Sequence, residues 1–192
     1  MIHILTNTYR TVDPLFGRNA RPIELDMGCG KGGFLLTLAE TCPDRLILGA
    51  DIMLGRLRRV ARKVERRELS NVELLRADNY ELAAFQLPDR SIRRVHLLCP
   101  DPWPKARHRH RRLVTTDFLT RLARILEPDG TLHVSTDHAP YQATFERLLT
   151  RRPFFAPAPE RLAELEHIGT EFERLWKTQG KAVPHLAYRK LL

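Results

Sequence analysis

Hydrophobic and polar positions follow two alternating periods from residue 22 to about residue 150. Short apolar runs typical of buried strands are separated by segments with apolar residues on one helical face. The predicted strands are Ile23–Met27, Leu46–Ala50, Val72–Ala77, Ile92–Leu98 and Thr131–Ser135. The predicted helices are Gly33–Glu40, Leu54–Glu68, Thr116–Leu126 and Tyr141–Thr150. This order predicts an α/β protein with a mostly parallel sheet and helices on both faces.

The sequence after residue 150 has a different pattern. Residues 153–159 are extended and rich in turn-forming residues, a polar segment and a short helix follow, and Val183–Leu191 has the pattern of a final strand. We expect a short N-terminal segment over residues 1–21 and a single domain over residues 22–192. Residues 151–182 then form an extension before the last strand.

Composition shows one strong deviation, an excess of positive charge. The 192 residues, 43% hydrophobic and 29% charged, suit one globular domain with a full core. The formal net charge of +9 favours a polyanionic partner. No apolar run is long enough to span a bilayer and no secretory signal is visible, so we expect no membrane contact. The odd set of Cys29, Cys42 and Cys99 fits a reducing cytoplasm.

A glycine-rich loop, DMGCGKGG over residues 26–33, joins the first predicted strand to the first helix. Glycines there let the backbone turn sharply and approach a cofactor closely. Gly28, Gly30 and Gly33 satisfy the G-x-G-x-x-G pattern of dinucleotide-binding proteins. An acid at Asp26 with glycines at 28, 30 and 32 instead fits S-adenosylmethionine (SAM) enzymes. A carboxylate repels a pyrophosphate and attracts the cationic amino group of methionine, so Asp26 favours SAM over a nicotinamide dinucleotide.

Polar residues also follow the next two predicted strands. Asp51 ends the second strand and suits a ribose diol, and Asp78 and Asn79 end the third, where SAM enzymes usually hold the adenine amine. The carboxyl ends of parallel strands are where open α/β sheets bind ligands. We therefore expect these side chains to form one cofactor site with Asp26. The alternative is a glycine turn with ordinary solvated acids.

The segment PDPWPKARHRHRR, residues 100–112, is the most unusual stretch of the chain. Each proline fixes its own φ and restricts the residue before it, so Asp101 is held rigidly just past the strand Ile92–Leu98. A carboxylate beside an aromatic ring and a run of cations indicates chemistry on a nucleic-acid base, with the cations gripping phosphates. Trp103 either stacks on a base or fills an apolar space between its flanking prolines.

A second concentration of positive charge lies on the predicted helix 54–68. This helix carries Arg56, Arg58, Arg59, Arg62, Lys63, Arg66 and Arg67. It is interpreted either as a solvated outer face or as a nucleic-acid surface. In the segment 100–112, His108 and His110 have no Cys or carboxylate spaced to complete a metal site, so we expect no metal.

Together these residues resemble the tRNA (guanine-N7)-methyltransferase family. The string Pro-Asp-Pro-Trp-Pro-Lys-x-Arg-His-x-x-Arg-Arg is the specific element, and the resemblance runs from about residue 22 to the C-terminus. Ser135-Thr136-Asp137 with Tyr141 looks like the family's Thr-Asp motif after the fifth strand. Residues 170–173 look like its Thr-x-Tyr/Phe-Glu motif before the last strand.

The resemblance implies both a fold and a function. The fold is the Rossmann-like class I methyltransferase, a mostly parallel seven-stranded sheet, with residues 151–182 on the substrate side. The function is SAM-dependent methylation of guanine N7 in tRNA, at guanosine 46 of the variable loop, in the cytoplasm and with no obligate protein partner.

Site residues are carried over by position. The proposed catalytic acid is Asp101, which also lies at the cofactor. The cofactor residues are Asp26, Gly28, Gly30, Asp51, Asp78 and Asn79. The substrate residues are Lys105, Asp137, Thr170, Glu171, Phe172 and Glu173, and the RNA-binding stretch is Arg107, His108, Arg109, His110, Arg111 and Arg112. The sequence departs from the family in having Asp26 and Asp51 where Glu is common and His110 where Lys is usual.

The chemistry of this reaction explains the carboxylates. Guanine N7 has a free lone pair and no proton, so methyl transfer needs alignment more than a general base. The product base is cationic, and a nearby carboxylate stabilises the charge as it develops. Asp101 and Asp137 are both candidates, and the sequence does not separate them.

Three other functions fit parts of the pattern. The net charge argues against a SAM enzyme of a small molecule or protein. The complete set of acids argues against a non-catalytic tRNA-binding scaffold. Asp26 argues against a nicotinamide-dependent oxidoreductase.

Overall fold

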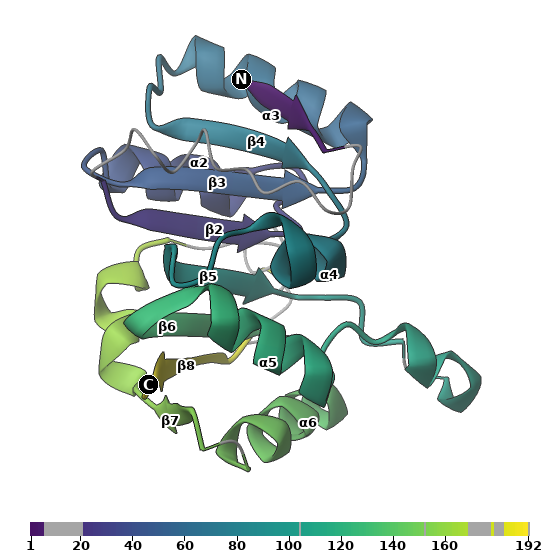
Figure 1. The fold of residues 1–192 in the computed structure, drawn as a ribbon. Coiled ribbons are helices and arrows are strands. Elements are labelled where there is room, and N and C mark those ends of the chain that lie inside the picture. The colour runs from purple at the N-terminus through teal and green to yellow at the C-terminus, as the bar shows by residue number, and fades with distance from the viewer. Residues whose placement is uncertain (6–20, 104, 152, 169–177, 179–182, 192) are drawn as a thin grey trace.

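One twisted sheet organises the molecule (Figure 1). The computed structural model describes residues 1–5, 21–103, 105–151, 153–168, 178 and 183–191, and of residues 106 and 109 the backbone only. Eight described strands follow the order β1-β4-β3-β2-β5-β6-β8-β7. They are β1 (Ile2–Ile4), β2 (Ile23–Met27), β3 (Leu46–Asp51), β4 (Val72–Arg76), β5 (Ile92–Leu98), β6 (Leu126–Ser135), β7 (Phe155–Pro157) and β8 (His185–Lys190).

The sheet is mostly parallel, as predicted, but it has one strand more than the seven expected. Strands β1 to β6 pair in parallel, whereas β8 is antiparallel to both β6 and β7. The extra strand is β1, which pairs with β4 at the edge of the sheet, in the register Ile2 with Leu74. Three residues are too few to show an alternating pattern, which is why the sequence did not reveal this strand.

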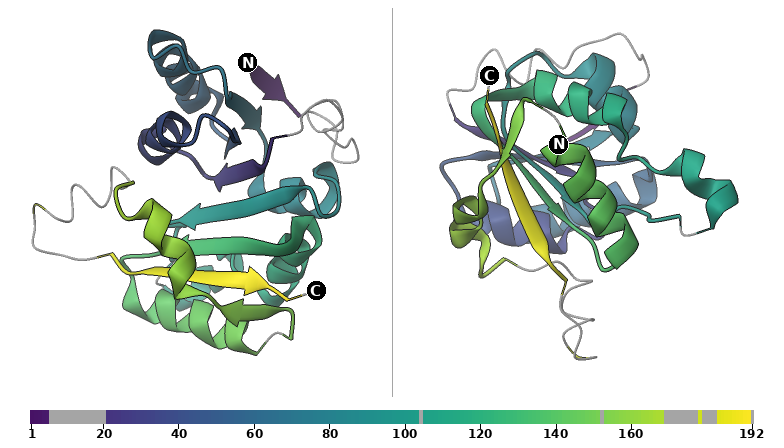
Figure 2. Two further views of the ribbon diagram at one scale, coloured as in Figure 1. Left: turned by 90° about the vertical axis from the view of Figure 1, so that its left-hand side faces the viewer. Right: turned by 90° about the horizontal axis from the view of Figure 1, so that it is seen from below.

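Helices cover both faces of the sheet (Figure 2). Helices α2 (Gly33–Thr41) and α3 (Leu54–Arg66) and the 3-10 helix η3 (Pro159–Leu165) pack over one face. The short helix α4 (Asn79–Glu81) with the π-helix η1 (Leu82–Gln86), α5 (Thr116–Ile125) and α6 (Ala139–Thr150) lie over the other. A further 3-10 helix, η2 (Ala106–Arg111), follows β5 and projects away from the body, as the blue-green excursion at the right of Figure 1 shows.

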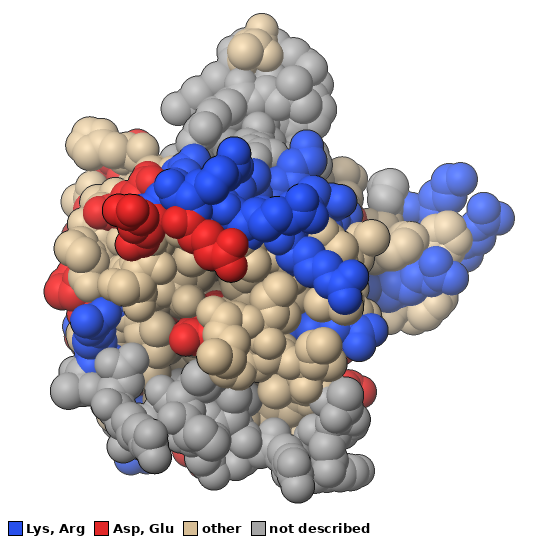
Figure 3. All heavy atoms as spheres, turned by 90° about the horizontal axis from the view of Figure 1, so that it is seen from above, with Lys and Arg blue, Asp and Glu red and all other residues tan. Residues whose placement is uncertain are grey.

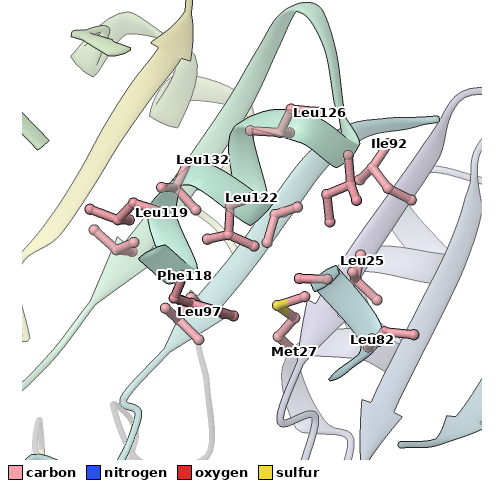
Figure 4. Packing of buried hydrophobic residues seen from close by; sticks show 14 of the residues in the cluster. Leu25, Met27, Leu82, Ile92, Leu97, Phe118, Leu119, Leu122, Leu126 and Leu132 are labelled. Atoms are coloured by element: carbon pink, nitrogen blue, oxygen red, sulfur yellow. The ribbon is translucent and has the colours of Figure 1, made fainter. Parts of the chain in front are cut away.

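The core explains why the strands have these sequences. In β3, Leu46, Leu48 and Ala50 face the core under α5 and α6, whereas Ile47 faces the core under α2 and α3. A strand buried on both faces needs an almost continuous apolar run, and every residue of β3 is buried. The larger core, part of which Figure 4 shows, joins the sheet to Phe118, Leu119 and Leu122 of α5.

One predicted boundary is wrong. The helix was expected to reach Leu126 and the next strand to begin at Thr131, but β6 begins at Leu126, opposite Ile92. The register then shifts, and pairing resumes between Arg94 and Thr131. Asp129, at φ +60°, lies in this irregular stretch. The turn-forming residues between Leu126 and Thr131 therefore form a bulge within β6 and do not form a loop before it.

A buried polar ladder crosses four strands beneath α2. Glu24 of β2 lies 2.8 Å from Nε2 of His96, whose Nδ1 lies 2.9 Å from Nδ1 of His133, and His133 lies 2.6 Å from His185. Arg45 also bonds to Glu24. Burial opposes ionisation of Glu24, but the His96 hydrogen bond and the charges of His96, Arg94 and Arg45 lower its pKa to about 2. The ladder satisfies polar groups inside the sheet.

Candidate active site

The glycine loop after β2 turns in a way that L side chains rarely allow. Gly28, Gly30 and Gly32 have φ values of +81°, +57° and +79°. The loop is fixed to the neighbouring strand, because the amides of Gly28 and Cys29 donate to the carbonyl of Ala50 at 2.8 and 2.9 Å. A Cβ on Gly32 would lie 3.0 Å from Val60 of α3. The loop is therefore built as a tight backbone cradle at the carboxyl edge of the sheet.

Asp51 holds this cradle from the end of β3. Its side chain is 4% exposed on the scale of relative accessibility and accepts hydrogen bonds from the Gly30 amide at 3.2 Å and the Met53 amide at 2.7 Å. The guanidinium of Arg56, in the first turn of α3, lies 3.5 Å from the same carboxylate. Sequence reasoning missed this role of Arg56. The sequence signal for this contact was Arg56 in the first turn of the helix that follows Asp51 at the end of its strand.

Asp26 lies within β2, one strand away from Asp51. It is buried, and burial together with the nearby Asp51 charge raises the pKa of Asp26 to about 7. Within the described part of the chain, no side-chain hydrogen bond satisfies its carboxylate, unlike that of Asp51. An acid whose pKa is raised by burial and by a neighbouring acid is suited to receive a cationic ligand group.

Asp78 and Asn79 complete this side of the edge. Asp78 caps α4, accepting from the amides of Tyr80 and Glu81 at 2.8 and 3.1 Å, and is exposed. The side chain of Asn79 reaches the glycine loop, because a Cβ on Gly28 would lie 3.7 Å from its Nδ2. Its Oδ1 is buried without a hydrogen-bond partner in the described part of the chain. This orphaned oxygen beside a glycine cradle fits a ligand with its own hydrogen-bond donor.

The loop after β5 presents Asp101 at the same edge. Cys99 is tied to β6 through the Ser135 carbonyl at 2.9 Å, and Asp101 is exposed two residues later. Two residues of this turn, Cys99 and Trp103, have positive φ values of +48° and +41°. Such conformations cost about 1–2 kcal/mol for a residue with a Cβ, so other contacts must hold them.

Arg112 holds this turn at Pro102 and Trp103. Its Nε donates to the carbonyl of Pro102 at 2.8 Å and its terminal nitrogen to that of Trp103 at 3.3 Å. Its guanidinium carbon also lies 5.3 Å from the ring centroid of Tyr141, which is fully buried. Arg112 was expected among the RNA-binding residues. The structure shows that its half-buried guanidinium clamps the Asp101 loop onto α6.

The other cations and histidines of this stretch lie on the projecting η2 or, in the case of Lys105, directly before it. Lys105, Arg107, His110 and Arg111 are exposed, and His108 is half-buried. Trp103 is half-buried between Arg111, whose guanidinium lies 5.0 Å from the ring centroid, and His108, whose ring meets it edge-on at 5.7 Å. The Trp103 ring thus packs against a guanidinium and an imidazole, and both interpretations of Trp103 stay predictions.

Asp137 lies at the neighbouring strand end. It is exposed two residues past Ser135, which pairs with Leu98 in the register between β6 and β5. Asp101 and Asp137 thus leave adjacent parallel strands at the same edge. Within the described residues, no group of three or more His, Cys, Asp or Glu side chains is arranged to hold a metal ion. No helix described is both long and apolar enough to cross a membrane.

Comparison with known proteins shows the family of this chain. The profile of a family described as putative methyltransferase matches residues 20–186. A tRNA (guanine-N(7)-)-methyltransferase of Leifsonia xyli subsp. xyli is 38% identical over 189 residues, covering 94% of this chain and 81% of that protein. Another, from Alkalilimnicola ehrlichii, is 37% identical, with coverage of 93% and 76%. The chain belongs to the tRNA (guanine-N7)-methyltransferase family.

Solved structures agree on the fold of this family member. The 16S rRNA methyltransferase KamB superposes with a TM-score of 0.67 at 19% identity, covering 94% of this chain and 92% of that one. A putative methyltransferase of Streptococcus mutans, in complex with SAH, superposes with a TM-score of 0.56 at 14% identity, with 89% of each chain covered. The predicted class I methyltransferase fold is confirmed, apart from its additional edge strand.

Some residues implied by the family resemblance cannot be placed. Thr170, Glu171, Phe172 and Glu173 lie outside the described residues, as does the side chain of Arg109. The structure brings the other expected residues to one edge of the sheet, Asp26, Asp51 and Asn79 on one side and Asp101 and Asp137 on the other. Their individual roles remain predictions.

Proposed function

We propose that this chain transfers the methyl group of SAM to N7 of a tRNA guanosine, at the carboxyl edge of its sheet. The observation that carries the proposal is the placement of Asp101. A clamped loop presents this exposed carboxylate at the same edge as a glycine cradle with two buried acids. The reaction named for the relatives requires a site for a cationic cofactor and a site for a base that becomes cationic. We call the part with Asp26, Asp51 and Asn79 the cofactor half, and the part with Asp101 and Asp137 the substrate half.

The cofactor half fits SAM in charge and in hydrogen bonding. Asp51 would accept from the ribose hydroxyls, and Asp26 would pair with the cationic amino group of the methionine part. The buried Oδ1 of Asn79 would accept from the adenine amine. SAM, when bound, supplies an electrophilic methyl group on a sulfonium. Two acids at this position disfavour the pyrophosphate of a nicotinamide dinucleotide.

The substrate half would orient the guanine and stabilise its charge. Because N7 has no proton to lose, Asp101 would not act as a general base. Its carboxylate would stabilise the positive charge that develops on the guanine as the methyl group is transferred. Asp137, at the next strand end, would bind the purine from the adjacent loop. The exposed cations Lys105, Arg107 and Arg111 would contact phosphates, which positions the tRNA without reading its sequence.

Finer parts of the proposal rest on the family resemblance. These are methylation at guanosine 46 of the variable loop, action in the cytoplasm, and substrate contacts from residues 170–173. They also include the assignment of residues 151–182 as a substrate-side extension of one domain.

One experiment tests the reaction and its position together. The purified protein is incubated with an unmodified tRNA transcript and methyl-labelled SAM, and the RNA is digested to nucleosides. We expect label in N7-methylguanosine, and none in a transcript that carries adenosine at position 46. A matched transcript with a guanosine exchanged elsewhere serves as the control. Label in another nucleoside, or in no RNA at all, contradicts the proposed function.

A further inference from the structure

A row of arginines without an ion-pair partner among the described residues lies on the outer face of α3. Arg58, Arg62 and Arg66 are spaced four residues apart and therefore line one face of the helix, with Arg59 beside them. All four side chains are exposed, while Leu57 and Val60 bury the opposite face. Figure 3 shows the positive charge as a continuous band over this side of the molecule. We call these four residues the α3 ridge.

Several other arginines on the described surface have an ion-pair partner, unlike those of the α3 ridge. Arg124 pairs with Asp89, Arg161 and Arg189 pair with Asp129, and Arg121 pairs with Asp117. The neighbouring cations of α3 also have partners, since Arg56 meets Asp51 and Arg67 meets Glu40. No such partner is found for the ridge among the described residues, and Glu65 is the sole carboxylate of α3.

This arrangement costs stability in the free protein. Like charges four residues apart repel each other and destabilise a helix. A polyanion that lies along the row removes this repulsion, because its phosphates neutralise the arginines. The release of condensed counterions then adds to the affinity. An acid at one ridge position would have relieved the repulsion, as Asp117 does for Arg121 on α5.

The place of α3 in the fold indicates which polyanion binds. The helix begins at Leu54, directly after Asp51 and Met53 at the cofactor half, and the basic η2 follows β5 on the substrate half. In Figure 3 the blue band faces the viewer and extends to the right, where the blue projecting segment lies farther from the viewer. Two basic surfaces thus flank the edge where the guanosine reacts.

We propose that the α3 ridge is a second phosphate-binding surface for tRNA, separate from η2, which holds a part of the molecule remote from the reacting guanosine. This inference rests on the proposed function, because it takes the tRNA of that reaction as its ligand. Contacts to phosphates supply affinity in a salt-dependent manner and leave the chemical step unchanged.

The test compares two pairs of substitutions that remove equal charge. The first is Arg58→Gln with Arg62→Gln, since glutamine keeps the helical propensity. The control is Arg147→Gln with Arg151→Gln, exposed positions at the end of α6. We expect the α3 variant to bind tRNA more weakly, with a plot of log affinity against log salt that is shallower by about 0.7–0.9 for each phosphate no longer neutralised. The control should keep wild-type affinity and slope.

Further measurements separate this inference from the proposed function. The α3 variant should methylate at the wild-type rate when tRNA saturates, and its SAM affinity should not change. The charge-preserving pair Arg58→Lys with Arg62→Lys should retain most of the tRNA affinity, which excludes misfolding as the cause. If the wild type methylates tRNA and the α3 variant binds like the wild type or like the control, the inference is wrong while the function stands. If the wild type does not methylate tRNA, the proposed function fails first.

Discussion

The two halves of the carboxyl edge are stabilised in different ways. In the cofactor half, the loops after β2 and β3 are bound to each other through backbone amides, and their acids are buried. In the substrate half, Asp101 and Asp137 are exposed, and the loop after β5 leads into a helix that projects from the body. One arginine clamp holds that loop to the rest of the fold.

This difference matches what each half has to bind. A small cofactor is enclosed by a cradle that exists before it arrives, so little reorganisation is needed on binding. A tRNA is too large to be enclosed at the carboxyl edge of the sheet, and an exposed loop can reach one of its bases. The comparison predicts that substitutions in the substrate half affect the reaction rate or tRNA affinity, whereas those in the cofactor half affect SAM affinity.

The largest effect is expected from Asp101→Asn. The amide is nearly isosteric but lacks the charge that stabilises the cationic product, so the single-turnover rate should fall by about 10²- to 10³-fold. Rapid-quench measurement with both substrates saturating gives this rate. SAM and tRNA affinities, measured separately, should stay near the wild-type values. A wild-type rate in this variant would leave Asp101 without a role in the chemical step.

A smaller effect is expected from Arg112→Gln. The substitution removes charged hydrogen bonds to the Pro102 and Trp103 carbonyls, and such bonds contribute about 1.5–3 kcal/mol each to ordering. Because the loop is partly exposed, we expect about a tenfold loss of single-turnover rate through misplacement of Asp101. The salt dependence of tRNA binding should remain that of the wild type.

Arg111→Gln is the matched control for this prediction. Its exposed guanidinium lies over Trp103 and makes no such contact with the loop carbonyls among the described interactions. The control should lower tRNA affinity and the salt slope while the saturated rate persists. If both variants lose only affinity, Arg112 is a phosphate contact and the clamp has no functional role.

The sequence predicted the strand ends at which the residues of the cofactor half lie, and their contacts with SAM stay predictions. Strand ends, glycines and acids are local signals, and the predicted limits of β2 and β5 agree with the structure. It did not predict that Arg112 turns inward, because the cations of residues 105–112 lack an apolar period that would separate buried from exposed positions. The α3 helix was predictable for the opposite reason, since Leu57 and Val60 mark its inner face.

Pairing across the sheet was also invisible in the sequence. The ladder from Glu24 through His96 and His133 joins residues that are far apart along the chain, and each alone looks like an ordinary polar residue in a strand. Only the strand order brings them together. The same holds for Arg56 and Asp51, whose contact depends on how α3 leaves the end of β3.

The smallest predicted effect is a pH dependence of SAM binding in the cofactor half. Burial and the Asp51 charge raise the pKa of Asp26 from 3.8 to about 7, so a large fraction of the free enzyme is protonated there at pH 6. If ionised Asp26 pairs with the cationic amino group, SAM affinity should rise severalfold between about pH 6 and 7.5, because the competent fraction increases. It should fall again near pH 8, where an α-amino group loses its proton. Calorimetric titration across this range measures both limbs.

Asp26→Asn is the control that decides whether Asp26 causes this rise. The variant should bind SAM more weakly and without the increase over the same pH range. In the absence of SAM, folding stability should change with pH in the direction opposite to SAM affinity. The reason is that the folded chain keeps the Asp26 proton at pH values where the unfolded chain has lost it. The contribution of Asp26 to the free energy of unfolding should therefore decrease from about pH 4 to about pH 7, so the difference between the wild type and Asp26→Asn should change with pH in that direction. An equal rise of SAM affinity in both proteins would assign the titration to a group other than Asp26.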